Sequence, residues 1–178
     1  MKPDALGWLS GVRHVVSPNH DGRPPGICID LLVIHSISLP PNEYGGHAIE
    51  RFFTNSLDHA EHPFFEQIKE LRVSSHFLVR RNGQVVQFVP CGKRAWHAGV
   101  SHWRDRNRCN DFSIGIELEG SDFEPYAEIQ YAALVRLTRR LKRIYPIADI
   151  VGHADIAPGR KTDPGPFFDW NGYFARLK

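Results

Sequence analysis

The chain has 178 residues, of which 42% are hydrophobic and 24% charged, and its formal net charge at pH 7 is only +2. This length suits one domain built around a single hydrophobic core, so we expect one domain over residues 1–178. The small charge, with no run of Lys or Arg longer than two, argues against a nucleic-acid partner. No stretch approaches the roughly 18 apolar residues needed to cross a bilayer, and residues 1–10 lack the pattern of a signal peptide. The sequence therefore predicts a cytoplasmic protein without a membrane partner.

Cysteine and histidine contents point to the kind of chemistry to expect. The three cysteines, Cys28, Cys91 and Cys109, are odd in number and show no C-x-x-C spacing, which argues against a disulfide framework or a cysteine-based zinc site. Ten histidines are many for a chain of this length. The composition therefore favours metal binding or acid–base chemistry by histidine side chains.

The first predicted elements are one strand and two helices. Residues 29–34 form a nearly continuous apolar run, which is typical of a buried central strand. Helices are predicted over about 46–53 and 63–71. Proline pairs such as Pro40-Pro41 mark turns between these segments.

A hairpin and a further strand are predicted in the middle of the chain. The runs 75–80 and 84–89 lie on either side of Asn82-Gly83, which is a strong signal for a β-hairpin. Residues 113–119 then alternate between apolar and other residues, as a strand does.

The longest predicted helix covers about 126–144 and ends before Pro146. Its apolar stripe consists of Ile129, Ala133, Leu137, Leu141 and Ile144. Four arginines occupy its other faces and fit a solvated surface better than a nucleic-acid stripe: Arg136, Arg139, Arg140 and Arg143. A short apolar strand over 148–151 follows. Strands interspersed with helices predict an α/β domain with a mixed central sheet flanked by helices.

Two histidines come directly after predicted strands. His35 follows the run 29–34 and His153 follows 148–151, so both are expected at the carboxyl ends of strands, where ligand sites of α/β proteins open. Catalytic zinc uses three ligands of the His, Asp, Glu or Cys type and keeps one position open for water. The turn-rich loop after His153 offers Asp163 as a third ligand.

Each of these residues has a simpler explanation when taken alone. A histidine at a strand end is more often a hydrogen-bonded structural residue, and Asp163 before Pro164 could initiate a turn. Asp155 is a competing carboxylate that spacing does not exclude.

Residues 113–119 provide a second set of chemically active side chains. With a period of two, Gly115, Glu117 and Glu119 share one face, and the two carboxylates lie about 7 Å apart along the strand. One of them could act as a general base. The alternative is an edge strand with a solvated charged face. Gly115 among apolar residues also predicts a close backbone approach or a bulge.

Five separated blocks, spanning about residues 6–170, carry a resemblance to a known family. They are LLVIHSISLPP, which contains His35, then SSHFLVRRNGQVVQFVP, KRAWHAG, CNDFSIGIELEG and GHADIAPGRKTDPGPFFDW. In this order they closely resemble the cytoplasmic anhydro-muropeptide amidases of the AmpD type, a branch of the zinc N-acetylmuramoyl-L-alanine amidases. The resemblance implies the fold shared with peptidoglycan recognition proteins and phage T7 lysozyme, with a catalytic core over about 29–170.

Carried over position by position, the resemblance implies a zinc centre with His35, His153 and Asp163 as ligands. Glu117 then takes the position of the general base, and Lys161 that of the electrophilic group. Asp rather than Cys as the third ligand is typical of the AmpD branch.

The resemblance also implies a cleft for a small muropeptide, with Arg72, Trp96 and Arg108 among its lining positions. This branch usually has Asn after the first zinc histidine, whereas this chain has Ser36, whose hydroxyl can replace part of that contact. The implied reaction is hydrolysis of the amide between (1,6-anhydro-)N-acetylmuramic acid and L-alanine in peptidoglycan recycling, by a monomer.

Two other functions compete with this interpretation. A non-catalytic peptidoglycan-recognition module would share the fold but lack one or more metal ligands. A zinc peptidase would cut within the stem peptide, but neither H-E-x-x-H nor His-x-His occurs in the chain. Of the other histidines, His76 is expected to be structural, and His97 is expected to line the cleft without binding the metal.

Overall fold

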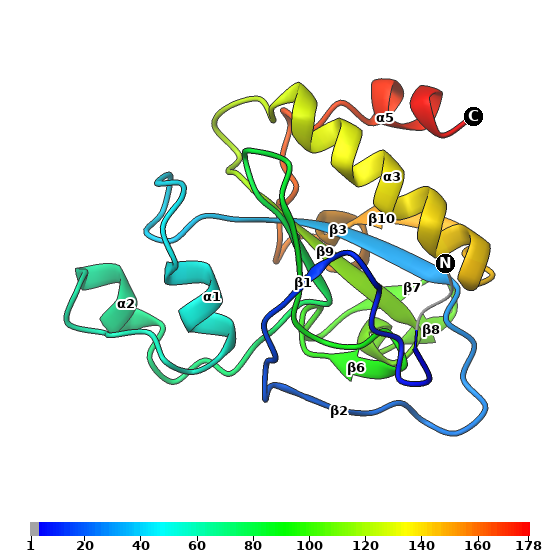
Figure 1. Cartoon of the computed structure of the whole chain (residues 1–178), viewed down its shortest axis with the longest axis horizontal. Helices are drawn as coiled ribbons and strands as arrows, with labels where there is room; N and C mark the ends of the chain where they lie inside the picture. The colour runs from blue at the N-terminus through cyan, green and yellow to red at the C-terminus, as the bar shows by residue number, and fades with distance from the viewer. Residues whose placement is uncertain (1–3) are drawn as a thin grey trace.

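A central β-sheet is the framework of the molecule, and the computed structural model describes it within residues 4–178 (Figure 1). Residues 1–3, the start of the segment without a signal-peptide pattern, lie outside the described residues. The sheet has six strands, which are, in spatial order, β1 (Arg13–His14), β5 (Val85–Gln87), β4 (Phe77–Val79), β9 (Ser113–Glu119), β3 (Leu31–Ile37) and β10 (Asp149–Gly152).

Parallel pairing dominates the middle of this sheet. β9 runs parallel to both β3 and β4, and β3 runs parallel to β10. β4 and β5 are antiparallel, as predicted for the hairpin around Asn82-Gly83. All residues of β9 are buried, as are the first five of β3, because a central parallel strand is covered on both faces. The predicted mixed central sheet is confirmed.

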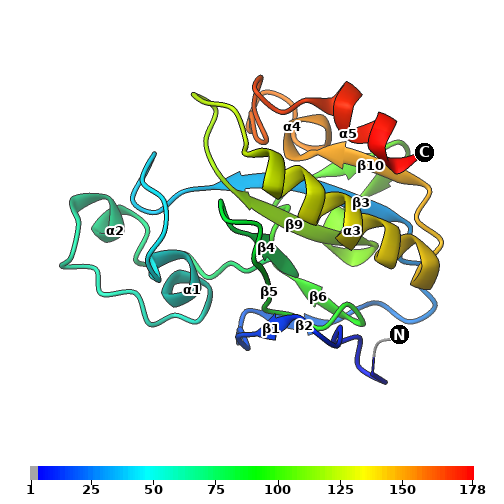
Figure 2. The same ribbon diagram turned by 45° about the horizontal axis from the view of Figure 1, so that its top comes forward.

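Helices α3 (Glu128–Ile144) and α5 (Trp170–Leu177) cover one face of the sheet (Figures 1 and 2). Side chains that point to this face, such as Leu32 and Ile116, form the largest apolar core together with Leu137 of α3. A fully buried side chain of this kind stabilises the fold by roughly 1.5–3 kcal/mol. This layer therefore holds the strands in the register that the site requires.

The prediction of an apolar stripe on α3 is confirmed in the middle of the helix and wrong in its first turn. Three of its members are buried, namely Ala133, Leu137 and Leu141. Ile129, however, is 52% exposed, because it lies in the first turn and packs against Gly83 at the tip of the hairpin rather than against the sheet. Gln130 takes the inward position instead, and its amide donates hydrogen bonds to the carbonyl oxygens of Val79 and Glu119.

The shorter elements gather on the opposite face and at one end of the sheet (Figure 2). They are the strand pairs β2 (His20–Gly22) with β6 (Lys93–Ala95) and β7 (His102–Trp103) with β8 (Arg106–Asn107), the 3-10 helix η1 (Cys109–Asp111), and the helices α1 (Ala48–Phe53), α2 (Pro63–Gln67) and α4 (His153–Ile156). One smaller core joins α1 and α2 to β4 and β5, and another joins η1 and α4 to β3 and β10.

Three sequence-based expectations need correction. The first strand continues to Ile37, so His35 lies inside the strand and not just after it, because the pairing with β9 continues to the end of both strands. The second helix ends at Gln67 rather than near residue 71, because the chain tightens into i to i+3 turns such as Leu71 N–H to the Ile68 carbonyl. Residues 113–119 form a central strand, so the edge-strand alternative is wrong.

Helix hydropathy and cysteine pairing complete the description of the fold. Within residues 4–178, no helix is long and apolar enough to cross a bilayer. The thiols of Cys28, Cys91 and Cys109 are all free, and the last two are buried.

Candidate metal centre and cleft

The parallel register brings three chemically active side chains to one level of the sheet. His35 on β3 lies opposite Glu117 on β9, while Ile34 lies opposite Gly152 at the end of β10. His153 follows Gly152 directly and therefore reaches the level of His35. Because neighbouring strands lie about 4.8 Å apart, the side chains of this row are close neighbours.

Three potential ligand atoms converge beside this row. Nδ1 of His35 lies 3.0 Å from Nδ1 of His153 and 3.2 Å from Oδ2 of Asp163, and Nδ1 of His153 lies 3.1 Å from the same oxygen. Ligand atoms bound at about 2.0–2.1 Å to a tetrahedral metal ion lie ~3.3 Å from one another. The three separations fit this value, so these residues form a candidate metal centre.

Protonation states also fit a cation at this point. Burial lowers the pKa of His35 to about 4, against the opposing effect of Asp163, so its ring is neutral at pH 7. Burial would raise the pKa of Asp163, but its contacts with His153 and His35 hold that pKa below its usual range. Nε2 of His153 lies 3.2 Å from the Ala98 carbonyl oxygen, which can only accept, so a neutral His153 ring has a bare Nδ1. This bare nitrogen faces an ionised carboxylate oxygen, an arrangement that a bound cation stabilises.

The loop that carries Asp163 is fixed by hydrogen bonds to its backbone carbonyl oxygens. The Ala154 N–H donates to the Asp163 carbonyl oxygen at 2.9 Å, and the Tyr126 hydroxyl donates to the Pro164 carbonyl oxygen at 2.7 Å. Asp155, the competing carboxylate, lies outside the centre, because it is exposed and its Oδ2 accepts the Gly152 N–H at 2.7 Å. Asp155 therefore stabilises the first turn of α4.

Glu117 is buried beside the candidate metal centre, and one of its two carboxylate oxygens has no hydrogen-bond partner among the described residues. Its side chain is almost inaccessible, and Oε2 lacks a hydrogen-bond partner among the residues described. Burial, reinforced by the charge of Asp163, raises the pKa of Glu117 well above its usual range, while the Lys161 ammonium opposes the shift. A buried carboxylate with a free oxygen and a raised pKa is a candidate for proton transfer.

These side chains open into a cleft of about 310 Å³. His35, Glu117, His153, Lys161 and Asp163 line one part of it, and its other wall is apolar. Sequence reasoning missed this wall, which consists of Leu39, Phe52, Phe53, Phe64, Ile68, Leu71 and Val73. The pairs of phenylalanines in the two short helices were a signal that could have indicated it.

The predicted substrate-binding residues divide into two groups. Ser36 and Trp96 line the cleft, as does His97. Arg72 is exposed, and its guanidinium donates to the Lys69 and Leu71 carbonyl oxygens at 2.7 and 3.0 Å. Arg108 is also exposed, on a left-handed backbone, and neither arginine lies among the cleft-lining residues. Their role in binding substrate stays a prediction.

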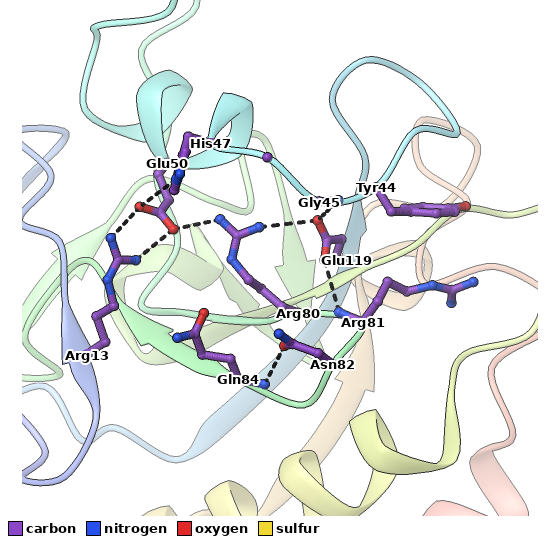
Figure 3. A pocket seen from close by; sticks show the side chains of 11 residues that line it. Arg13, Tyr44, Gly45, His47, Glu50, Arg80, Arg81, Asn82, Gln84 and Glu119 are labelled. Atoms are coloured by element: carbon purple, nitrogen blue, oxygen red, sulfur yellow. Dashed lines mark hydrogen bonds and ion pairs between the residues drawn. The ribbon is translucent and has the colours of Figure 1, made fainter.

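A second hollow, of about 600 Å³, surrounds Glu119 and is built differently (Figure 3). The Arg80 guanidinium reaches Glu50 at 2.6 Å and Glu119 at 3.4 Å, and Arg13 donates to both oxygens of Glu50. Oε2 of Glu119 accepts the Arg81 N–H at 2.9 Å. Because these buried charges are paired within the network, the hollow is a structural junction rather than a reactive site.

Comparison with known proteins agrees with this geometry. Residues 22–166 match the family described as N-acetylmuramoyl-L-alanine amidase. The 1,6-anhydro-N-acetylmuramyl-L-alanine amidase AmpD of Enterobacter cloacae is 58% identical over 173 residues, which cover 96% of this chain and 92% of that protein. A crystal structure of a selenomethionine derivative of AmpD has a TM-score of 0.95 and 52% identity, with 100% of both chains covered. Escherichia coli AmiD, in complex with the substrate anhydro-N-acetylmuramic acid-L-Ala-D-gamma-Glu-L-Lys, has a TM-score of 0.62 and 33% identity, covering 86% of this chain and 60% of AmiD.

The chain belongs to the N-acetylmuramoyl-L-alanine amidase family and is therefore a hydrolase. Its similarity to the AmpD relatives confirms the branch that the five sequence blocks predicted, and the structural match confirms the predicted fold class.

Proposed function

We propose that this chain is a zinc-dependent amidase that hydrolyses the amide bond between 1,6-anhydro-N-acetylmuramic acid and L-alanine in muropeptides. The observation that carries the proposal is the convergence of His35, His153 and Asp163 beside Glu117 in a cleft. The names of the AmpD relatives and the substrate bound to AmiD supply the substrate class. The reaction serves the recycling of cell-wall fragments in the cytoplasm.

The set of donors suits zinc. Two imidazole nitrogens and one carboxylate oxygen, with a fourth position open to the cleft, are a common ligand set for catalytic zinc. When bound, zinc supplies a Lewis acid that lowers the pKa of water from about 15.7 to about 7. Two neutral histidines and one carboxylate leave the centre with a net positive charge, which favours an anionic transition state.

Glu117 accepts the proton of the attacking water and later delivers it to the departing amine of L-alanine. Its free Oε2 leaves a position for that proton, and its raised pKa makes the carboxylate a better proton acceptor than an ordinary glutamate. Proton transfer by a positioned group of this kind contributes roughly 10²–10⁴-fold to rate.

Lys161 stabilises the negative charge that develops on the scissile carbonyl oxygen. It lines the same cleft as Glu117, and its charge is felt there, because it opposes the upward pKa shift of that carboxylate. A donor aimed at a developing oxyanion is typically worth about 3–4 kcal/mol.

The rest of the cleft would hold the two halves of the substrate. The compact anhydro sugar suits an apolar surface such as Trp96, with the Ser36 hydroxyl nearby on the cleft lining. Arg72 and Arg108 would contact carboxylates of the stem peptide through paired hydrogen bonds. Anchoring both halves fixes the scissile amide near Glu117.

One experiment separates this proposal from its competitors. The purified protein is analysed for zinc and then incubated with an anhydro-muramyl tripeptide, and product masses are measured. We expect one zinc per chain, with free tripeptide and anhydro sugar as products. Binding of the muropeptide without cleavage would favour a recognition module, and cleavage within the peptide would favour a peptidase.

Specificity for the sugar is tested with anhydro and reducing-end muropeptides that carry the same stem peptide. We expect a higher kcat/KM for the anhydro substrate. Equal values, or rapid digestion of intact cell-wall sacculi, would contradict the assignment to recycling. Light scattering of the zinc-loaded protein checks the expectation that it is a monomer.

A further inference from the structure

Two consecutive residues contact the Nε2 atoms of the two histidines in the candidate metal centre. Nε2 of His35 lies 2.9 Å from Nδ1 of His97, and Nε2 of His153 lies 3.2 Å from the carbonyl oxygen of Ala98. In both histidines this is the ring nitrogen that points away from Asp163. The segment His97–Ala98 therefore contacts both imidazoles on the side opposite to the candidate metal position.

We propose that His97–Ala98 is the positioning element of the metal centre, and that its two acceptors commit Nδ1 of both histidines to the metal. A neutral imidazole carries one ring proton, so donation from Nε2 leaves Nδ1 with a free lone pair. The inference rests on the proposed zinc site and adds a residue, His97, that acts on the metal only through His35.

A third group completes the hydrogen-bond chain behind His35. When His35 binds metal through Nδ1, its Nε2–H must donate to Nδ1 of His97. The proton of a neutral His97 is then on Nε2, which lies 3.2 Å from Oγ of Ser113. The Ser113 hydroxyl is buried at the start of β9 and accepts a hydrogen bond from this N–H group. The hydrogen-bond chain therefore runs from His35 through His97 to Ser113.

The positioning segment is itself fixed by side chains that have no other role in the site. Oδ1 of Asn110 accepts the backbone N–H groups of His97 and Ala98 at 3.2 and 2.8 Å. The Arg160 guanidinium also donates to the Ala98 carbonyl oxygen, at 2.7 Å. A backbone held at both peptide groups keeps its acceptors in place without the metal, which is the preorganisation that a metal site requires.

Gly115 makes room for the His97 ring. A Cβ atom added at Gly115 would lie 2.6 Å from Cγ of His97, which is far below a normal contact, and the ring cannot bend away as a flexible chain would. The close backbone approach predicted for this glycine therefore occurs, and its partner is the positioning residue. Glycine at 115 is required because any side chain would displace His97 from His35.

The test compares two variants of the same shape, His97→Asn and His97→Leu. Asn places Oδ1 where Nδ1 of His97 lies and so keeps the acceptor for His35, whereas Leu has a methyl group there. Zinc affinity is measured by competition with a chelator, and the metal-free variants are checked by thermal unfolding. We expect His97→Leu to weaken zinc binding by roughly 10- to 100-fold and His97→Asn to remain close to the wild type.

Equal zinc affinity of wild type, Asn and Leu variants would overturn the inference. An equal loss in Asn and Leu would also overturn it, because the effect would then come from packing and not from the acceptor. Wild-type protein without zinc would instead refute the proposed function. Gly115→Ala supports the inference if it weakens zinc binding while the metal-free protein still unfolds cooperatively.

A measurement on the unaltered protein gives a second test that does not depend on variants folding. Nitrogen-15 NMR of the zinc-loaded wild type reports which ring nitrogen of each histidine carries the proton. We expect Nε2–H in His35, His97 and His153. A proton on Nδ1 of His97 would reverse the direction of the chain and contradict the inference.

Discussion

Glu117 and Glu119 lie two residues apart on the same face of β9, and both are buried, but their surroundings are opposite. Oε1 of Glu119 accepts the Gly45 N–H at 2.8 Å and also contacts Arg80, and Oε2 accepts the Arg81 N–H. Oε2 of Glu117 has no partner among the described residues. One carboxylate is satisfied on both oxygens, and the other is not.

The difference separates a structural carboxylate, Glu119, from Glu117, the carboxylate proposed to be reactive. A buried carboxylate whose hydrogen bonds are all made holds the surrounding backbone in place and has no free site for a proton. A buried carboxylate with an unmade bond destabilises the folded protein, but its pKa is raised and it can exchange a proton with a substrate. The fold places both types on one strand, and the register decides which of them lies beside the two histidines of the candidate metal centre.

The largest expected effect comes from removing the reactive charge. Glu117→Gln should lower kcat by roughly 10²–10⁴-fold, because the amide cannot take the proton of the attacking water. Zinc content, measured on the same samples, should stay at one ion per chain. Glu119→Gln is the matched control and should keep kcat within a few-fold in the folded protein. Equal losses of kcat at both positions would remove the distinction between the two carboxylates.

The next effect concerns the structural charges. Arg80→Met removes the cation between Glu50 and Glu119, so these two buried carboxylates lose their shared partner. This loss should lower the free energy of unfolding by about 3–5 kcal/mol. Urea unfolding measures this change. Arg51→Met is the control, because Arg51 forms an exposed ion pair with Glu61 at 3.0 Å, and its loss should cost less than about 1 kcal/mol. Similar losses in both variants would contradict the structural role of the junction.

A smaller effect of opposite sign is expected for the stability of metal-free Glu117→Gln. Folding raises the pKa of Glu117 above its ordinary value of 4.5, so the stability that this group contributes at low pH is lost as the pH rises through the raised pKa. Gln has no such loss. The metal-free variant should therefore match the wild type near pH 4 and be more stable by about 1–3 kcal/mol at pH 8. Urea unfolding at both pH values is the measurement. A variant that is less stable than the wild type at pH 8 would contradict the raised pKa of Glu117.

The smallest effects are expected for charges that are neither buried nor fully paired. Arg72→Ala and Arg108→Ala should each raise KM by no more than roughly fivefold and leave kcat unchanged, because exposed charges are screened by solvent. Steady-state kinetics on an anhydro-muramyl tripeptide tests this. Arg136→Ala, on the exposed surface of α3, should change neither constant. A large fall in kcat for Arg72→Ala or Arg108→Ala would place that residue in the reacting complex.

Much of the sheet could be predicted from the sequence because its signals are local. The continuous apolar run 29–34 and the alternation in 113–119 follow from which faces are buried, and Asn82-Gly83 favours the hairpin turn through its backbone alone. Helix 63–71 was predicted too long, because periodicity does not show where i to i+3 turns replace the helix. Strands of two or three residues, such as β7, have too few residues for a pattern.

The sequence points to the candidate ligands of the site but not to the residues that hold these ligands in place. His35 and His153 could be singled out because each comes at or near the end of an apolar run. The acceptors behind them could not, since Ala98 contributes a backbone carbonyl, which every residue has, and His97 acts through contacts with β3 and β9. Nor does the sequence show why Glu117 lacks a partner while Glu119 has several. That difference depends on which loops pack over each end of one strand.

β10 lies at an edge of the sheet and is only four residues long, with consequences for when the proposed zinc site can take up its ion. His35 and His153 are 118 positions apart, and the pairing of β10 with β3 is what brings them together. During synthesis, a chain that has emerged only as far as β9 carries His35 alone of the three proposed ligands, so the proposed site is not yet formed. In the finished protein, local opening of this edge would separate His153 from His35 and release the ion of the proposed site without unfolding of the whole domain.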